Sequence, residues 1–258
     1  MVVTKLKADW KPIIRVPERI SSVSFLLDED FLEQYNAVVD SSFNGNSTLK
    51  VLRHDDGIVK GSNPFAVALV GEMVKPLGYS VATQAQLEQV VATDALPLRG
   101  QYEDNGLVFR SVEGTNEYLA RNLAEQLEAR GIKSKHSVVI SLADVQVVND
   151  RNSNYNLSFK LRDEAKPIEA NILDVDGSFN LQDIDINTGL PSKLGEGDRY
   201  SCIIGRGLSR LCLGESLDLD SGSEDLASSG VGGRVVLIRG EAAENVQLRQ
   251  MYEQRQSE

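Results

Sequence analysis

The stretch of residues 107–142 constrains the fold more than any other part of this chain. Residues 107–112 (Leu-Val-Phe-Arg-Ser-Val) have the composition of a strand, and residues 137–142 (Ser-Val-Val-Ile-Ser-Leu) that of a second, buried strand. A helix is expected between them. A strand, a helix and a strand in this order form the crossover unit of a parallel sheet. We therefore predict a βαβ-like unit over about 107–142, within an α/β or α+β protein.

The helix of this unit has the clearest pattern in the chain. Thr115 or Asn116 is suited to cap its start, and Gly131 suits the left-handed position after its end at Arg130, because glycine lacks a Cβ. Its apolar residues recur at spacings of three and four, so that they share one face. They are Leu119, Ala120, Leu123, Ala124 and Leu127.

The part before residue 150 contains further helices. Asn63-Pro64 places a polar cap before a proline at the first helical position, where a missing N–H costs nothing. Thr83 and Gln86 fit the capping-box spacing. After an alternating strand at residues 22–27, the predicted helices are about 30–39, 64–75 and 84–93.

The N-terminal residues 11–17 (Lys-Pro-Ile-Ile-Arg-Val-Pro) are predicted to be extended, because proline disfavours helix in the residue before it. They form either a strand packed on their own domain or an arm that reaches a neighbouring subunit.

Beyond about residue 150 the pattern changes to short apolar runs between Gly, Asp, Asn and Ser, which is typical of antiparallel sheet. Asp176-Gly177 is suited to a hairpin turn. Residues 241–256 are read as a terminal helix or a tail. We therefore divide the chain into an α/β part at 1–150 and a β-rich, acidic part at 151–258, with a soft boundary, since both parts fit within one domain.

Composition and charge argue against two classes of partner. The 258 residues carry a net charge of −11 without a basic run, whereas nucleic acid and anionic membranes need clustered Lys and Arg. No apolar run approaches the roughly 20 residues of a membrane span, and the first residues show no secretory signal. Cys202 and Cys212 form neither a CxxC motif nor a disulfide framework. We predict a cytoplasmic protein in which both thiols are reduced and buried; a disulfide between them is the alternative.

An acidic stretch offers the first candidate metal site. Asp174, Asp176, Ser178 and Asn180 alternate, and Asp185 closes the stretch. Oxygen ligands at every second position are what a calcium loop uses, because Ca²⁺ takes six to eight hard oxygens. The glycine falls at the fourth position instead of the sixth, however, and the twelfth residue is Asp instead of Glu. The alternative is a hairpin whose polar side chains face water.

A second candidate is His54-Asp55-Asp56-Gly57, since histidine with carboxylates binds divalent metals or acts as an acid–base pair. On a strand, His54 and Asp56 share one face while Asp55 faces away. A metal needs about three converging ligands, and the other histidine, His136, has no spacing that places it nearby. The alternative is an Asp-Asp-Gly turn.

The motifs of common enzyme classes are missing from the sequence: no nucleophile elbow, no phosphate-binding loop, no HExxH and no zinc-type cysteine spacing. We therefore expect a non-catalytic binding or assembly protein, such as a subunit of a larger structure, with a protein partner or self-association. The alternative is a metal-dependent hydrolase whose divalent cation, such as calcium, is held by carboxylate and His ligands. Its candidate ligands are His54, Asp56, Asp174, Asp176, Asn180 and Asp185.

Overall fold

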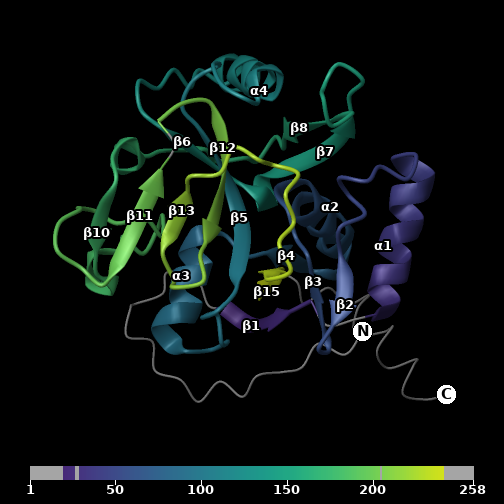
Figure 1. Cartoon of the computed structure of the whole chain (residues 1–258), viewed down its shortest axis with the longest axis horizontal. Helices are drawn as coiled ribbons and strands as arrows, with labels where there is room; N and C mark the ends of the chain where they lie inside the picture. The colour runs from purple at the N-terminus through teal and green to yellow at the C-terminus, as the bar shows by residue number, and fades with distance from the viewer. Residues whose placement is uncertain (1–19, 27–28, 204, 241–258) are drawn as a thin grey trace.

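The computed structural model describes residues 20–26, 29–203 and 205–240. The predicted arm at 11–17 and the predicted helix or tail at 241–256 lie outside these ranges. Within them lie four α-helices, all before residue 150, and each confirms a predicted helix (Figure 1). They are α1 (Glu29–Ser42), α2 (Pro64–Val74), α3 (Gln84–Thr93) and α4 (Glu117–Ala129).

The start of α2 shows how local chemistry sets a helix boundary. The Asn63 side chain accepts the N–H of Ala66 at 2.8 Å, and Pro64 occupies the first turn. The Asn63 amide also donates to the carbonyls of Thr48 and Ala227, at 2.8 and 3.1 Å. One side chain therefore caps the helix and ties it to two distant segments.

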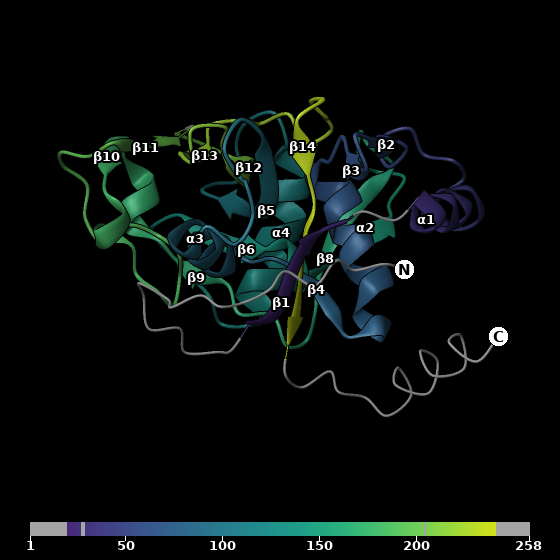
Figure 2. The same cartoon turned by 90° about the horizontal axis from the view of Figure 1, so that it is seen from below.

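A ten-stranded, mainly antiparallel sheet forms the centre of the molecule, with β10 and β11 at one end and α1 beyond the other (Figures 1 and 2). Its main path runs β10 (Gly177–Phe179), β11 (Arg199–Ile203), β13 (Leu219–Ser221), β12 (Leu208–Leu213), β5 (Tyr102–Phe109), β14 (Gly233–Arg234), β3 (Ile58–Lys60) and β2 (Arg53–Asp55). Off this path, β6 (Val138–Ser141) pairs with β5 and with β9 (Ile168–Glu169). With its helices concentrated before residue 150, the fold is of the α+β class.

Two smaller sheets complete the described strands. One contains β1 (Ile20–Phe25), β15 (Val236–Gly240) and β4 (Tyr79–Val81), with β15 in the middle. The other pairs β7 (Val145–Asn149) with β8 (Leu157–Leu161). The ten-stranded sheet draws strands from both sides of residue 150, and the largest apolar core does the same, from Leu26 to Leu237.

The predicted parallel crossover is wrong in one respect. The order β5, α4, β6 follows the prediction, but β6 pairs directly with β5 in antiparallel register, from Gly106 opposite Ser141 to Phe109 opposite Val138. Helix α4 buries Leu119, Ala120, Leu123 and Leu127 in the main core. Periodicity reports the type and order of elements, but strand direction depends on partners elsewhere in the sheet.

The predicted hairpin at Asp176-Gly177 is also wrong. A 3₁₀ turn (Asn171–Asp174) precedes β10, and β10 pairs with β11, about twenty residues further on. The sequence could not show this pairing because Asp-Gly favours a tight turn without requiring one.

The two cysteines differ in exposure. Both are free thiols, but Cys212 is buried whereas Cys202 is exposed. On β11 the side chains alternate, with Arg199 and Ser201 buried and Tyr200 and Cys202 facing outward. The prediction of two buried thiols is therefore wrong for Cys202.

Candidate ligand-binding pocket

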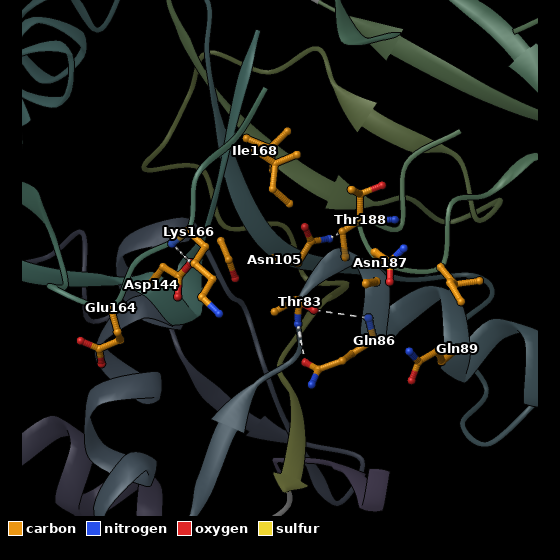
Figure 3. A pocket seen from close by; sticks show the side chains of 15 residues that line it. Thr83, Gln86, Gln89, Asn105, Asp144, Glu164, Lys166, Ile168, Asn187 and Thr188 are labelled. Carbon is orange, nitrogen blue, oxygen red and sulfur yellow. Dashed lines mark hydrogen bonds between the residues drawn. The ribbon is translucent and has the colours of Figure 1, made fainter. Parts of the chain in front are cut away.

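A cavity of about 690 Å³ lies between β5, β6, the first turn of α3 and the loop at residues 185–190 (Figure 3). Its described lining consists mainly of amide, hydroxyl and aliphatic side chains. The lining residues are Thr83, Gln84, Ala85, Gln86, Gln89, Asn105, Val139, Ser141, Asp144, Glu164, Lys166, Ile168, Ile186, Asn187 and Thr188. Its size falls in the range of small-molecule sites.

Asn105 reaches this pocket because β5 is irregular at that residue. The pairing of β5 with β12 passes from Gly106–Leu211 directly to Asp104–Cys212, so Asn105 is the extra residue of a β-bulge. On the other edge of β5, the neighbour changes from β14 at Glu103 to β6 at Gly106. A bulge redirects a side chain, and this one lies where two partner strands diverge. Asn105 is 1% exposed and lies near the centre of the lining residues (Figure 3).

The first turn of α3 forms another side of the pocket. The Thr83 hydroxyl accepts the N–H of Gln86 at 3.3 Å, and the Gln86 side chain accepts the N–H of Thr83 at 3.0 Å. This confirms the predicted capping box. A helix start fixed in this way directs the positive end of the helix dipole toward the pocket.

A buried chain of hydrogen bonds fixes the orientation of the Asn105 amide. Arg199 donates to both carboxylate oxygens of Glu88, each at 2.7 Å, so Glu88 acts as an acceptor. Gln84 therefore turns its NH₂ to Glu88, at 2.8 Å, and its oxygen to Asn105, whose NH₂ donates at 2.8 Å. The Asn105 oxygen is thus left facing the pocket, because its nitrogen is already committed. Burial raises the pKa of Glu88, and the Arg199 hydrogen bonds oppose that rise.

Two amide oxygens of the pocket are buried without a hydrogen-bond partner among the described residues. They belong to Asn105 and Gln89. In Figure 3 the Asn105 oxygen points toward the space between Ile168 and Thr188. A buried acceptor left unpaired costs about 1–3 kcal/mol, and a ligand that donates a hydrogen bond removes this cost.

The loop at 185–190 closes the pocket against α3. Asp185 accepts the N–H of Asn187 at 2.7 Å and that of Thr188 at 3.3 Å. Gly189 has φ +71°, and a Cβ at this position would meet the backbone nitrogen of Ala85 at 2.4 Å. The loop backbone therefore lies directly on the first turn of α3, which requires glycine at 189.

Charged side chains gather on one side of the pocket, opposite Asn187 and Thr188 (Figure 3). Asp144 accepts the backbone N–H of Lys166 at 3.1 Å, and Glu164 pairs with Lys75 at 2.5 Å. The Lys166 ammonium makes no ion pair with a described residue. The pocket thus has a charged side and a neutral, hydrogen-bonding side.

The candidate site at His54 and Asp56 lies elsewhere, at the exposed hairpin between β2 and β3. Asp55 pairs with Ile58, and Asp56 and Gly57 have φ values of 51° and 76°, which makes them the two central residues of a tight turn. Asp56 pairs with Lys60 at 2.7 Å, and this hydrogen bond lowers the pKa of Asp56. The turn reading of this motif is therefore the one observed.

The other four candidate ligands each accept or donate hydrogen bonds, Asp185 within its own loop and the other three to neighbouring segments. Asp174 bonds His136 Nδ1 and the Ser137 hydroxyl, both at 2.7 Å, and its pKa is lowered although burial acts to raise it. Asp176 accepts the N–H of Ile203, and Asn180 donates to the carbonyl of Glu196. Asp185 organises the pocket loop.

The structure places Asp185 in the loop that lines the pocket, next to the lining residues Ile186, Asn187 and Thr188, but places Asp174 and His136 together in a separate pair. Over the described ranges, no group of three or more His, Cys, Asp or Glu side chains is placed to hold a metal ion. The metal site stays a prediction from the sequence.

Sequence reasoning did not find the pocket. The available signal was Glu103-Asp104-Asn105, three polar residues directly before the apolar run of β5, all of them buried. Glu103 pairs with Arg234 and Asp104 with Arg210, more than 100 positions away, so the sequence does not reveal how these groups are satisfied.

Comparisons with protein-family models, with curated proteins and with solved structures found no match to this chain. In the part of the chain that the structure describes, no helix is both long and apolar enough to span a membrane. The function therefore has to be inferred from the geometry of the pocket.

Proposed function

We propose that this chain is a non-catalytic binding protein that takes a small polar ligand into the pocket between β5 and α3. The observation that carries this proposal is the buried amide oxygen of Asn105, which a fixed hydrogen-bond network leaves facing the cavity. An unpaired buried acceptor opposes folding, so a bound molecule that donates a hydrogen bond to this oxygen stabilises the folded state.

The lining supports binding without chemistry. None of the described lining residues is His or Cys, and of the three charged ones Glu164 pairs with Lys75 while Asp144 accepts the backbone N–H of Lys166. Two of the hydroxyls already accept backbone N–H groups, Ser141 from Ala143 and Thr188 from Leu190, both at 3.2 Å. These hydroxyls therefore position the loops that contain them.

Thermal unfolding of the whole chain tests the proposal, with L-glutamine, urea, myo-inositol, spermidine, citrate and inorganic phosphate as probes. A ligand at about 100 times its Kd stabilises the folded state by about 2.7 kcal/mol, which moves the midpoint visibly. Thr188→Trp fills the pocket from the loop and should abolish the shift. Val231→Trp is the matched control, because Val231 is 77% exposed and outside the pocket. Equal shifts in the wild type and in Thr188→Trp would contradict the proposal.

The assembly half of the sequence-based expectation rests on residues 11–17, which lie outside the described ranges. It stays a prediction, together with the protein partner. Removal of residues 1–17 should lower the mass measured by light scattering, and an unchanged mass would count against the arm. The metal-dependent hydrolase also stays a prediction, without support from the described geometry.

A further inference from the structure

We infer that the ligand presents a neutral carboxamide group, either a primary amide or a peptide group, on an aliphatic body. This inference rests on the proposed function, because it names the chemistry that the same pocket recognises. Three properties of the described lining lead to it: the fixed polarity of Asn105, the first turn of α3, and the absence of aromatic side chains.

The first property requires a hydrogen-bond donor on the ligand. Arg199 fixes Glu88, Glu88 fixes Gln84, and Gln84 fixes Asn105, so that Asn105 offers an oxygen and not an NH₂. Gln89 has a second unpartnered oxygen in the same lining. A carboxylate has only acceptors at neutral pH and would leave the Asn105 oxygen unpaired.

The second property requires an acceptor on the same ligand. Thr83, Gln84, Ala85 and Gln86 line the pocket with the first turn of α3. The capping box already bonds the N–H of Gln86, and Gly189 lies against the Ala85 nitrogen, which leaves the first N–H of the helix, that of Gln84, without an intrahelical partner at the positive end of the dipole. On the charged side Glu164 is paired with Lys75, and Asp144 and Lys166 carry opposite charges, so this side has no excess charge that would select a charged ligand. A carboxamide combines the required donor and acceptor without a net charge.

The third property concerns the body of the ligand. Val139, Ile168 and Ile186 provide an aliphatic wall, and no aromatic ring is found among the described lining residues. Ligands that bind by stacking, such as nucleobases, therefore lack a platform in this pocket. A polyol has few apolar faces to place against the aliphatic wall. A ligand with methylene groups next to an amide can place the methylene groups against the aliphatic wall and the amide against Asn105 and the first turn of α3.

Isothermal titration of the whole chain with L-glutamine and L-glutamate tests this inference, because the two probes have the same shape and differ in one amide. Glutamine is expected to bind at least about tenfold tighter. N-acetyl-L-glutamine N-methylamide is the third probe: tighter binding of this capped form points to a peptide ligand, and tighter binding of free glutamine to a small molecule. Both outcomes support recognition of a carboxamide.

Variants connect the preference to the two oxygens. Asn105→Leu and Gln89→Met should each weaken glutamine binding roughly tenfold, since each removes one acceptor. Gln182→Met is the matched control, because Gln182 is an exposed amide outside the lining. If Asn105→Leu does not fold, Gln89→Met decides. Tighter binding of glutamate, or of phosphate, that Thr188→Trp blocks would overturn the carboxamide and leave the pocket's function standing. No binding of either amide would also overturn the inference.

Discussion

The acidic stretch at residues 174–185 and the pocket wall formed by Asn105 and Gln89 both contain side-chain oxygen atoms. They differ in whether those oxygens have hydrogen-bond partners. In the acidic stretch the oxygens of Asp174, Asp176 and Asp185 accept hydrogen bonds from their own or neighbouring loops. In the wall the oxygens of Asn105 and Gln89 are buried and find no partner among the described residues.

The difference shows that a density of acidic residues is a poor guide to a site. An exposed carboxylate has water and nearby N–H groups available, so its presence needs no ligand to explain it. A buried amide oxygen without a partner does need an explanation, because the chain bears its cost. We therefore expect substitutions in the network of Arg199, Glu88, Gln84 and Asn105 to lower the stability of the protein, and substitutions in the acidic loops to have little effect on it.

The largest expected effect comes from Arg199→Met, which leaves the Glu88 carboxylate buried and unpaired. Arg199 and Glu88 are 5% and 2% exposed at their side chains. Removing one partner of such a pair costs about 3–5 kcal/mol. Urea unfolding should show this loss. Arg121→Met is the control, because the Arg121–Glu117 pair is exposed and contributes less than about 1 kcal/mol. Equal losses in the two variants would mean that the network does not stabilise the wall.

Gly189→Ala should have the next largest effect. Its φ of +71° disfavours alanine, and the added Cβ would meet Ala85 backbone at 2.4 Å. We expect a loss of about 2–3 kcal/mol of stability, together with weaker binding in the pocket. Gly131→Ala separates the two causes, since Gly131 has φ +77° but no atom within 4 Å of the added Cβ. That control should cost about 1 kcal/mol. A cost at 189 no larger than at 131 would show that the loop does not press on α3.

A pH measurement distinguishes the buried carboxylates from the loop carboxylates. Burial raises the pKa of Glu103 to about 7, with Arg234 opposing the rise. The folded state therefore binds more protons than the unfolded chain between about pH 4.5 and pH 7, and stability falls as pH rises through this window. From pH 5 to pH 7.5 we expect a loss of about 2 kcal/mol from this group.

Glu103→Gln should flatten that slope in urea unfolding at the two pH values. Asp174 behaves in the opposite sense, because its pKa is lowered, so its contribution is lost as pH falls through the acid range. A slope in Glu103→Gln equal to that of the wild type would assign the pH dependence to other groups.

The sequence predicted features that depend on neighbours along the chain. The Thr83 capping box and the Asn63-Pro64 start of α2 depend on a few adjacent residues. These signals act locally, so that a single sequence contains them in full.

The features that it missed depend on distant partners. The direction of β6 is decided by β5 and β9 together, and the bulge at Asn105 is defined by its pairing with β12. The network of Glu88, Gln84 and Asn105 is completed by Arg199, which lies 111 positions after Glu88 in the sequence. The pocket could not be predicted because it was recognised from the Asn105 side-chain oxygen, which has no hydrogen-bond partner among the described residues. Which atoms have partners depends on the folded structure and not on neighbouring residues in the sequence.

The smallest expected effect concerns calcium. We expect thermal unfolding to show that calcium changes the stability by less than about 0.5 kcal/mol relative to EDTA, because Asp174, Asp176 and Asn180 already bond neighbouring segments of the chain. A stabilisation by calcium that Asp176→Asn abolishes would restore the calcium loop and break the comparison. Asp56→Asn provides the control from the exposed hairpin, where Lys60 already pairs with the carboxylate. If Asp56→Asn abolishes the stabilisation by calcium and Asp176→Asn does not, the calcium site lies at the β2–β3 turn, and the acidic stretch has only a structural role.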